Sequence, residues 1–150
     1  MTSTKRGSVV VDAAVVLKWQ FDDEEHVAQS VALRDAFLVS SRVKLVAPTL
    51  IVHEIINGIS TAVRRKRVSA KDALQALDNL LGVGIEIKEA SPQRALNLGL
   101  QYGLSAYDAA YVAVAEAEGC ELVTGDRMLY EAVKDRLGWV KWLGEYSLEG

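Results

Sequence analysis

Four acidic residues stand at positions where a fold could bring them together. Asp12 and Asp126 closely follow short apolar runs of the strand type, and Glu54 and Asp108 lie in the first turns of predicted helices. Carboxylate oxygens are the ligands that Mg²⁺ and Mn²⁺ prefer, and such groups repel one another when no cation lies between them. In one shared cleft, these four side chains would form a site for a hard divalent cation.

Each carboxylate also has a purely structural explanation. Asp12 and Asp126 could cap the helices that follow them. Asp108 stands three residues after Ser105, which is the spacing of a capping box. Glu54, on the polar shoulder of its helix, could be an ordinary solvent-exposed glutamate. Residue by residue both explanations stay open, whereas the combination of four such positions favours the shared site.

The elements that would position these residues alternate between short strands and longer helices. Five apolar or β-branched runs are predicted strands: Ser8–Val11, Leu45–Ala47, Ile85–Ile87, Leu122–Thr124 and Trp139–Trp142. Four segments carry helical signals: Thr49–Arg67, Ser69–Leu81, Ser105–Glu118 and Arg127–Arg136. Strands separated by helices indicate right-handed crossovers and a parallel sheet that is covered on both faces.

We therefore expect one α/β domain over residues 1–150, a three-layer α/β/α sandwich around a parallel sheet of about five strands, with a disordered tail over residues 1–7. In such sheets, ligands bind beyond the carboxyl ends of the strands, where the strand order reverses. Asp12 and Asp126 are expected at that edge. Glu54 and Asp108 are expected at the same edge because their helices begin there.

Composition limits the kind of protein without identifying it. The net charge of −3 argues against a protein that coats nucleic acid through bulk positive charge. Cys120 is the only cysteine, which excludes an internal disulfide and a cysteine-based zinc site. No apolar stretch approaches the roughly 18 residues of a membrane-spanning helix, and the polar N-terminus does not resemble a signal peptide. A cytoplasmic protein is expected.

Three protein classes of similar topology would each need a feature that this chain lacks. A haloacid-dehalogenase-type phosphatase would carry a second aspartate two residues after Asp12, where this chain has Ala14. A dinucleotide-binding domain would carry a glycine-rich turn after the first strand, and no P-loop occurs. A response-regulator receiver would carry an aspartate at the end of its third strand, and residues 85–88 contain none.

Four stretches of sequence carry a family resemblance: VVVDAAVVLKW at 9–19, EIIN at 54–57, LSAYDAAY at 104–111 and LVTGD at 122–126. In this order and spacing they resemble the PIN-domain nucleases, specifically the VapC-type toxins of prokaryotic toxin–antitoxin pairs. Each stretch alone is short, whereas together they are specific. The resemblance extends from about Val9 to Trp142, which is nearly the whole chain.

The resemblance implies a PIN-like fold and a Mg²⁺- or Mn²⁺-dependent endoribonuclease that hydrolyses RNA phosphodiester bonds. It also implies a homodimer that is silenced by a cognate antitoxin. The catalytic and metal-binding positions carry over to Asp12, Glu54, Asp108 and Asp126. Asp12 and Asp108 would be the leading ligands, and either Glu54 or Asp126 could take the proton of the attacking water.

Two positions depart from the family pattern. Ala14 stands where the family often has serine or threonine, and Gly125 stands where a larger residue is frequent. A hydroxyl that could orient Asp12 or a metal-bound water is therefore absent. Two alternatives stay open: an RNA-processing nuclease without an antitoxin, and a PIN-like binding module that has lost turnover.

Several polar side chains are candidates for contact with the substrate or a partner: Lys18, Asn57, Arg64, Arg65 and Thr124. The basic run 64–67 could grip an RNA backbone or the acidic segment of an antitoxin, or it could be a solvated helix end placed favourably against the helix dipole. Lys18 could contact phosphate, or could keep its charge in solvent above an apolar stem. His26 and His53 are expected at the surface.

Overall fold

The sheet has five parallel strands, as the alternating pattern predicts. In the computed structural model, which describes residues 7–148, the strands are β1 (Gly7–Val11), β2 (Val43–Pro48), β3 (Glu86–Lys88), β4 (Glu121–Thr124) and β5 (Val140–Trp142). Their order across the sheet is β3-β2-β1-β4-β5, and each neighbouring pair is parallel. The strand order therefore reverses between β1 and β4, in the middle of the sheet.

The central strand β1 is apolar on both faces because helices cover both sides of the sheet. Val10 and Val11 are fully buried. Val10 pairs in register with Val46 of β2, and Val11 pairs with Val123 of β4. This register fixes which residues of β1 and β4 face each other where the strands end.

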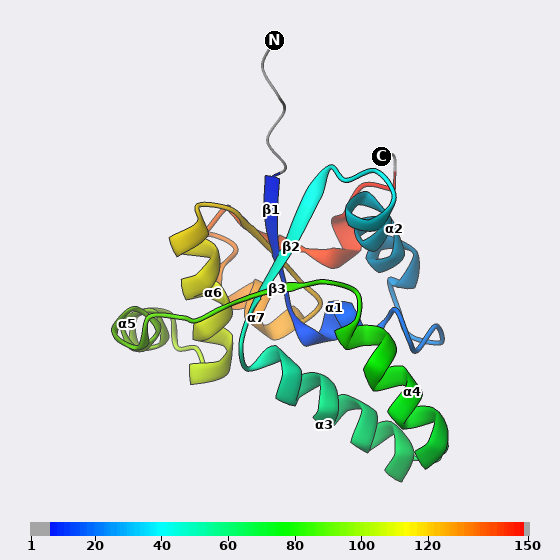
Figure 1. Ribbon diagram of the computed structural model, residues 1–150. Helices are drawn as coiled ribbons and strands as arrows, with labels where there is room; N and C mark the ends of the chain where they lie inside the picture. Colours follow the sequence, from blue (N-terminus) through cyan, green and yellow to red (C-terminus); the bar gives the residue numbers. More distant parts are fainter. Residues whose placement is uncertain (1–6, 149–150) are drawn as a thin grey trace.

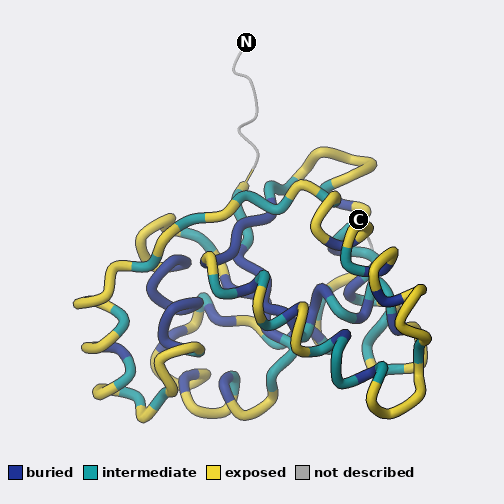
Figure 2. The backbone as a smooth tube through the Cα atoms, turned by 60° about the horizontal axis from the view of Figure 1, so that its bottom comes forward, coloured by how far each residue is buried: buried dark blue, intermediate teal, exposed yellow. Residues whose placement is uncertain are grey.

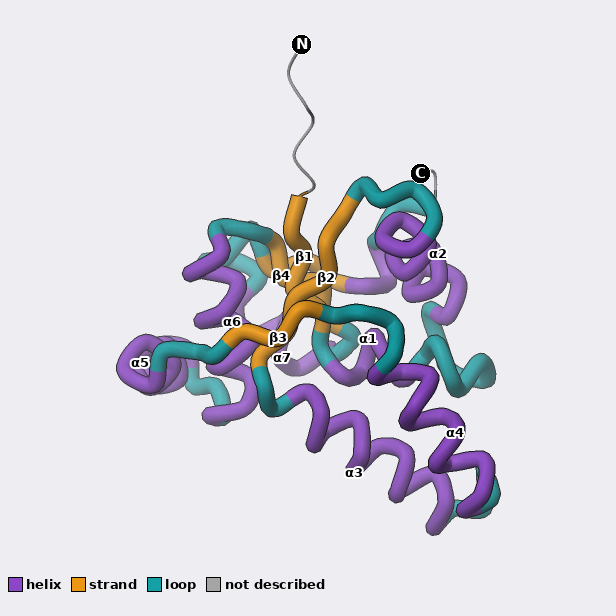
Figure 3. Tube along the Cα trace, viewed as in Figure 1, coloured by secondary structure: helices purple, strands orange, loops and turns teal. Residues whose placement is uncertain are grey.

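Helices cover the two faces of the sheet in a three-layer arrangement, which confirms the predicted fold class (Figures 1 and 3). The helices are α1 (Ala13–Leu17), α2 (Val27–Leu38), α3 (Ile51–Arg64), α4 (Ala70–Leu81), α5 (Pro92–Tyr102), α6 (Ala106–Glu118) and α7 (Arg127–Val133), and a 3-10 turn η1 (Leu143–Glu145) follows β5. One side of the sheet carries α5 and α6, and the other carries α1 and α2, while the α3–α4 hairpin extends beyond the carboxyl ends of the strands.

Helix α6 packs closely on the sheet because most of its side chains are small. Residues 109–115 are all buried. The helix begins where Ser105 accepts a hydrogen bond from the backbone amide of Asp108 over 3.1 Å, as its sequence predicts. It ends at Gly119, which adopts the left-handed conformation that favours glycine. The start of α6 is thereby set one turn before the acidic residue that it carries.

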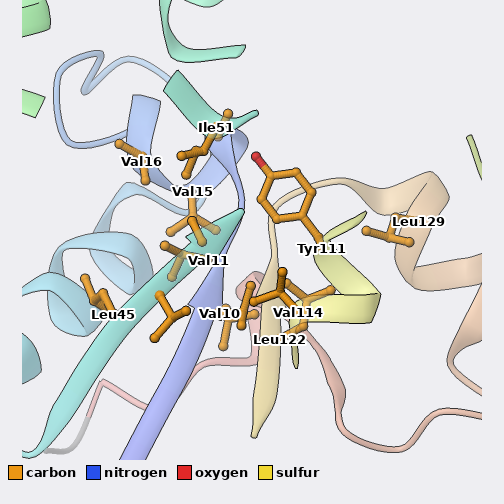
Figure 4. Close-up of a cluster of buried hydrophobic side chains, with 14 of the residues drawn as sticks. Val10, Val11, Val15, Val16, Leu45, Ile51, Tyr111, Val114, Leu122 and Leu129 are labelled. Atoms are coloured by element: carbon orange, nitrogen blue, oxygen red, sulfur yellow. The ribbon is translucent and has the colours of Figure 1, made fainter. Parts of the chain in front are cut away.

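The hydrophobic core lies on both sides of β1 and β4. Figure 4 shows side chains of β1, α1, β2, α6 and β4 in one cluster, among them Val10, Val15, Leu45 and Leu122. Figure 2 shows the buried backbone in the middle of the molecule and the exposed backbone along the outer helices. The fold therefore rests on the same central strands whose ends carry Asp12 and Asp126.

The structure differs from the predicted elements in three places. Gly7 belongs to β1, paired with Val43, instead of to a disordered tail; residues 1–6 lie outside the described part of the chain. Helices α2 and α5 were not predicted. The apolar residues of α2 do not gather on one face, whereas α5 carries the local signal of an N-cap serine, Ser91, followed by Pro92.

Within residues 7–148, no helix combines the length and the apolar character that crossing a bilayer would require.

Candidate active site

Asp12 and Asp126 flank the position where the strand order reverses. Asp12 directly follows β1, and Asp126 lies just beyond β4. Because Val11 pairs with Val123 in the ladder, the next residues in each strand also face each other, and the hydroxyl of Thr124 donates a hydrogen bond to Oδ2 of Asp12. The two carboxylates therefore lie in the crevice where parallel α/β sheets bind ligands.

Three donors hold the carboxylate of Asp12. The backbone amides of Val15 and Gly125 donate to Oδ1 over 3.1 and 3.2 Å, and the hydroxyl of Thr124 donates to Oδ2. The bond from Val15 makes Asp12 the N-cap of α1. Capping and membership of the site are thus not alternatives at this residue, because the cap itself orients the carboxylate.

Burial dominates the protonation of Asp12. Loss of solvent raises its pKa from 3.8 to about 6, although the hydrogen bonds from Thr124, Gly125 and Val15 lower it, and the charge of Asp126 raises it further. At neutral pH the group is ionised but poorly solvated. A cation at the site would therefore stabilise the ionised form.

Asp126 likewise caps its own helix. Its Oδ1 accepts hydrogen bonds from the backbone amides of Met128 and Leu129 over 2.9 and 3.3 Å. Its own backbone amide donates to the hydroxyl of Thr124 over 2.9 Å. Thr124 therefore bridges the two aspartates, with its oxygen accepting from Asp126 and its proton donated to Asp12.

Helix α6 brings Asp108 to the same crevice. Its side chain is half-buried, and burial is the largest cause of its raised pKa. The negative charges of Asp126 and Glu54 raise that pKa further, whereas the hydroxyl of Ser105 lowers it. A charge that perturbs a carboxyl must lie near it, so Asp108 lies near both Asp126 and Glu54.

Glu54 reaches the site from the first turn of α3. Its Oε1 accepts a hydrogen bond from the hydroxyl of Tyr111 over 2.5 Å, which joins α3 to α6. The two residues are 57 positions apart in the chain. Burial, followed by the effect of Glu54, raises the pKa of the Tyr111 hydroxyl, so it remains a donor at neutral pH.

The chemistry of these donors fits a hard divalent cation. None of the four carboxylates forms an ion pair with a Lys, Arg or His among residues 7–148. Within the same range, no three acidic, histidine or cysteine side chains stand close enough to enclose an ion. Binding of one cation would therefore draw the carboxylates of the site closer together.

A groove of about 600 Å³ adjoins the carboxylates along α3. It lies beside the first turn of α1 and is lined by Ala13, Ala14, Leu17, Leu50, His53, Glu54, Asn57, Gly58 and Tyr107. Asn57 and His53 are exposed on its wall, as expected for the polar face of α3. The lining of the groove is therefore mostly apolar, with the polar side chains of α3 next to Glu54.

Two of the predicted contact residues are buried instead. Lys18 is 9% exposed, and its Nζ lies 3.4 Å from Oε1 of Glu24. Thr124 is fully buried, and its hydroxyl is occupied by the two aspartates. The structure thus places Lys18 in an internal ion pair and gives Thr124 a positioning role within the site.

Much of the basic run at the end of α3 is engaged within the protein. Arg67 lies 2.6 Å from Asp23 and 3.4 Å from Glu24, in the acidic loop between α1 and α2. Arg64 donates to the hydroxyls of Ser60 and Thr61 on its own helix. Arg65 is exposed, about 16 Å along the helix from Glu54.

Ala14 and Gly125, the two departures from the family pattern, are in contact. A Cβ at position 125 would lie 3.0 Å from Cβ of Ala14 and 3.3 Å from the backbone of Ala14 and Val15. Backbone atoms at that distance cannot move aside as a flexible side chain can. The small residue at 14 and the absent side chain at 125 therefore form one feature of the site.

Replacing Gly125 by alanine is expected to destabilise the protein by about 1–3 kcal/mol, because the added methyl overpacks the start of α1. Urea unfolding of the metal-free protein measures this change. Gly138→Ala is the matched control, since a Cβ there meets nothing within 4 Å. Equal stability of Gly125→Ala and wild type would contradict the close contact.

Tyr111 is the residue of this site that sequence reasoning missed. It stands three residues after Asp108, on the same face of α6, and it is 2% exposed. A signal was present, since Tyr111 is the one side chain with a hydroxyl among the buried alanines and valines of residues 109–115. Its partner Glu54 could not be inferred, because the two helices meet only in the fold.

Comparisons with known proteins agree with this arrangement. A family model described as the PIN domain matches residues 9–135. Ribonuclease VapC9 of Mycobacterium tuberculosis is 31% identical over 121 residues, which cover 81% of this chain and 87% of that protein. Ribonuclease VapC3 of Pyrobaculum aerophilum is 34% identical over 97 residues, which cover 62% of this chain and 74% of that protein. The crystal structure of PAE2754 from Pyrobaculum aerophilum superposes with a TM-score of 0.68 at 26% identity, covering 93% of this chain and 92% of that one.

Proposed function

The chain belongs to the PIN domain family, and from that premise we propose that it is a Mg²⁺- or Mn²⁺-dependent endoribonuclease, the toxin of a VapBC-type toxin–antitoxin system. Relatives that match most of the chain bear the name VapC ribonuclease, which supports the activity. The proposed reaction is hydrolysis of RNA phosphodiester bonds.

One observation carries the proposal. Asp12 and Asp126 are joined through Thr124 where the strand order reverses, and the negative charges of Asp126 and Glu54 raise the pKa of Asp108. Arranging like charges in this way destabilises the protein unless a cation joins them. Such an arrangement therefore favours a metal-dependent reaction over a purely structural role.

Asp12, Asp108 and Asp126 would hold the ion, and Glu54 would complete its surroundings. A divalent cation at such a site lowers the pKa of a bound water and neutralises charge on phosphate oxygens. Thr124 and the amides of Val15 and Gly125 hold Asp12 in place for that role. Glu54 or Asp126 would accept the proton of the attacking water.

The proposal is tested on purified protein freed of any partner. With Mg²⁺ or Mn²⁺ it should cleave single-stranded RNA, and EDTA should stop the reaction. The same ions should raise the melting temperature, because a ligand that binds only the folded state stabilises it. Cleavage at full rate in EDTA, or no change in melting temperature across millimolar metal, would count against the assignment.

Ala14 motivates one alternative, a PIN-like module that binds RNA without cleaving it. The structure places Ala14 on the groove, next to the residues that hold Asp12. If wild type binds RNA but cleaves only after Ala14→Ser, this alternative gains. An RNA-processing nuclease without an antitoxin is the other alternative, and the neighbouring reading frame distinguishes it, since a toxin is encoded beside a small DNA-binding partner.

RNA and an antitoxin are the proposed partners. Asn57 lies on the groove beside Glu54 and is placed to contact either. Arg65 is available for a phosphate contact, although it lies far from the carboxylates along α3. Arg65→Ala should therefore weaken RNA binding modestly and reduce its salt dependence, while the chemical step stays nearly intact.

We expect a homodimer formed through the outer face of α5. Leu96 and Leu100, one turn apart, are 63% and 76% exposed, and burying two such side chains favours association. Light scattering at micromolar concentration should give the dimer mass, and Leu100→Glu should shift it toward the monomer. Leu74→Glu on α4, also exposed, is the control. A monomer mass for wild type would reject the dimer.

A further inference from the structure

Tyr111 combines a side chain in the core with a hydroxyl at the candidate active site. The ring is 2% exposed and belongs to the cluster around β1 and β4 (Figure 4). In that view the oxygen points away from the core cluster, toward the end of the sheet where α1 and α3 begin. Packing of the ring therefore determines where the hydroxyl lies.

The hydroxyl meets groups from two other elements. It donates to Oε1 of Glu54 over 2.5 Å. A backbone hydrogen bond from Ala13 to the same hydroxyl oxygen lowers its pKa. Ala13 follows Asp12, and Tyr111 itself is one turn from Asp108 on α6. The hydroxyl oxygen of Tyr111 is therefore bonded to Glu54, lies beside the residue that follows Asp12, and belongs to the helix that carries Asp108.

The hydrogen bond also gives the two carboxylate oxygens of Glu54 different partners. Oε1 is occupied by Tyr111, which leaves Oε2 to face a cation. Without this bond the carboxylate would sample several rotamers about its three side-chain torsions, because Glu54 is only half-buried. Partners of this kind orient metal ligands, and their removal typically weakens metal binding about 10–100-fold.

We propose that Tyr111 is a positioning residue, whose hydroxyl holds Glu54 in the orientation that divalent metal binding requires. The proposal rests on the metal-dependent function argued above. Tyr111 acts through Glu54 and does not itself contact the metal or the RNA. Its contribution should therefore vanish when Glu54 is removed.

The test compares Mn²⁺ binding by wild type and Tyr111→Phe, measured by calorimetry, with the stability of each metal-free protein followed by urea unfolding. The phenylalanine ring keeps the packing and removes only the hydroxyl. We expect the Mn²⁺ dissociation constant to rise about tenfold. RNA cleavage by Tyr111→Phe should recover at saturating Mn²⁺, which a general loss of structure would not allow.

Two controls make the result specific. Tyr146→Phe removes a hydroxyl beside Arg42 and Glu121, at the amino ends of β2 and β4, and should leave Mn²⁺ binding unchanged. In a Glu54→Ala background, which lacks the acceptor, adding Tyr111→Phe should change the dissociation constant by no more than about twofold. A tenfold loss in that background would overturn the proposed route through Glu54.

An unchanged Mn²⁺ affinity in Tyr111→Phe would overturn the inference while leaving the metal site intact. Absence of Mn²⁺ binding by wild type itself would instead remove the proposed function, and this inference with it. A drop in metal-free stability with unaltered Mn²⁺ affinity would assign Tyr111 to packing alone. Calorimetry with Mn²⁺ and urea unfolding of the metal-free protein together distinguish these three results.

Discussion

Asparagine in place of Asp12 or Asp108 is expected to slow RNA cleavage by about a hundredfold or more, which is a barrier increase of roughly 3 kcal/mol. Each substitution keeps the size of the side chain and removes one negative charge from the site. The loss is large because those charges hold the ion that activates water and stabilises charge on the phosphate. Single-turnover cleavage of a labelled RNA at saturating protein measures the chemical step directly.

Controls for this prediction come from acidic residues outside the crevice. Glu118→Gln lies at the opposite end of α6 from Asp108, is exposed, and should cleave like wild type. Glu54→Gln should also be impaired, since Glu54 is one of the proposed ligands or the base. Activity of Asp12→Asn within a few-fold of wild type, with metal still required, would exclude Asp12 as a ligand of that metal.

Asp12→Asn slows cleavage, but it should make the metal-free protein more stable. The pKa of Asp12 is about 6 in the folded state, above its usual value of 3.8. Between these values the unfolded chain loses the proton first, so stability falls as pH rises and levels off above pH 6. Two pKa units correspond to roughly 3 kcal/mol, so Asp12→Asn should be more stable by about that amount at pH 7.5.

The geometry around Asp12 allows asparagine to keep most of its hydrogen bonds. Both backbone amides donate to Oδ1, which the asparagine carbonyl oxygen can replace. The amide nitrogen would then face the hydroxyl of Thr124, which can accept as well as donate. Asp12→Asn therefore removes mainly the negative charge of the side chain.

Urea unfolding from pH 4 to pH 8 in EDTA measures the difference in unfolding free energy between Asp12→Asn and wild type. This difference should approach zero near pH 4 and reach its plateau above pH 6. Asp78→Asn, on the exposed face of α4, serves as the control for a general charge effect. Mn²⁺ should reduce or reverse the difference in unfolding free energy between Asp12→Asn and wild type, because the ion stabilises wild type more. A variant less stable than wild type at pH 7.5 without metal would contradict the raised pKa.

Local patterns in the sequence determined most of the elements that position the site. All five strands occur where apolar runs predict them. Burial on both faces selects such runs in β1, β2 and β4, whereas β3 and β5 lie at the edges of the sheet and are more exposed. Ser69 and Ser105 begin their helices as predicted, since an N-cap bond spans only three residues. Four short motifs, in their order and spacing, resemble the family that the comparisons show.

Only the tertiary structure decided how these residues interact. The bond of Tyr111 to Glu54, the pairing of Arg67 with Asp23 and the bridge of Thr124 to Asp12 join residues 57, 44 and 112 positions apart. Lys18 was a candidate phosphate contact or a surface lysine, yet folding buries it in an ion pair with Glu24. The raised pKa of Asp12 likewise follows from burial by several elements at once. Sequence periodicity reports which face of an element is buried, whereas the partner of a polar group depends on packing between elements that are distant in the chain.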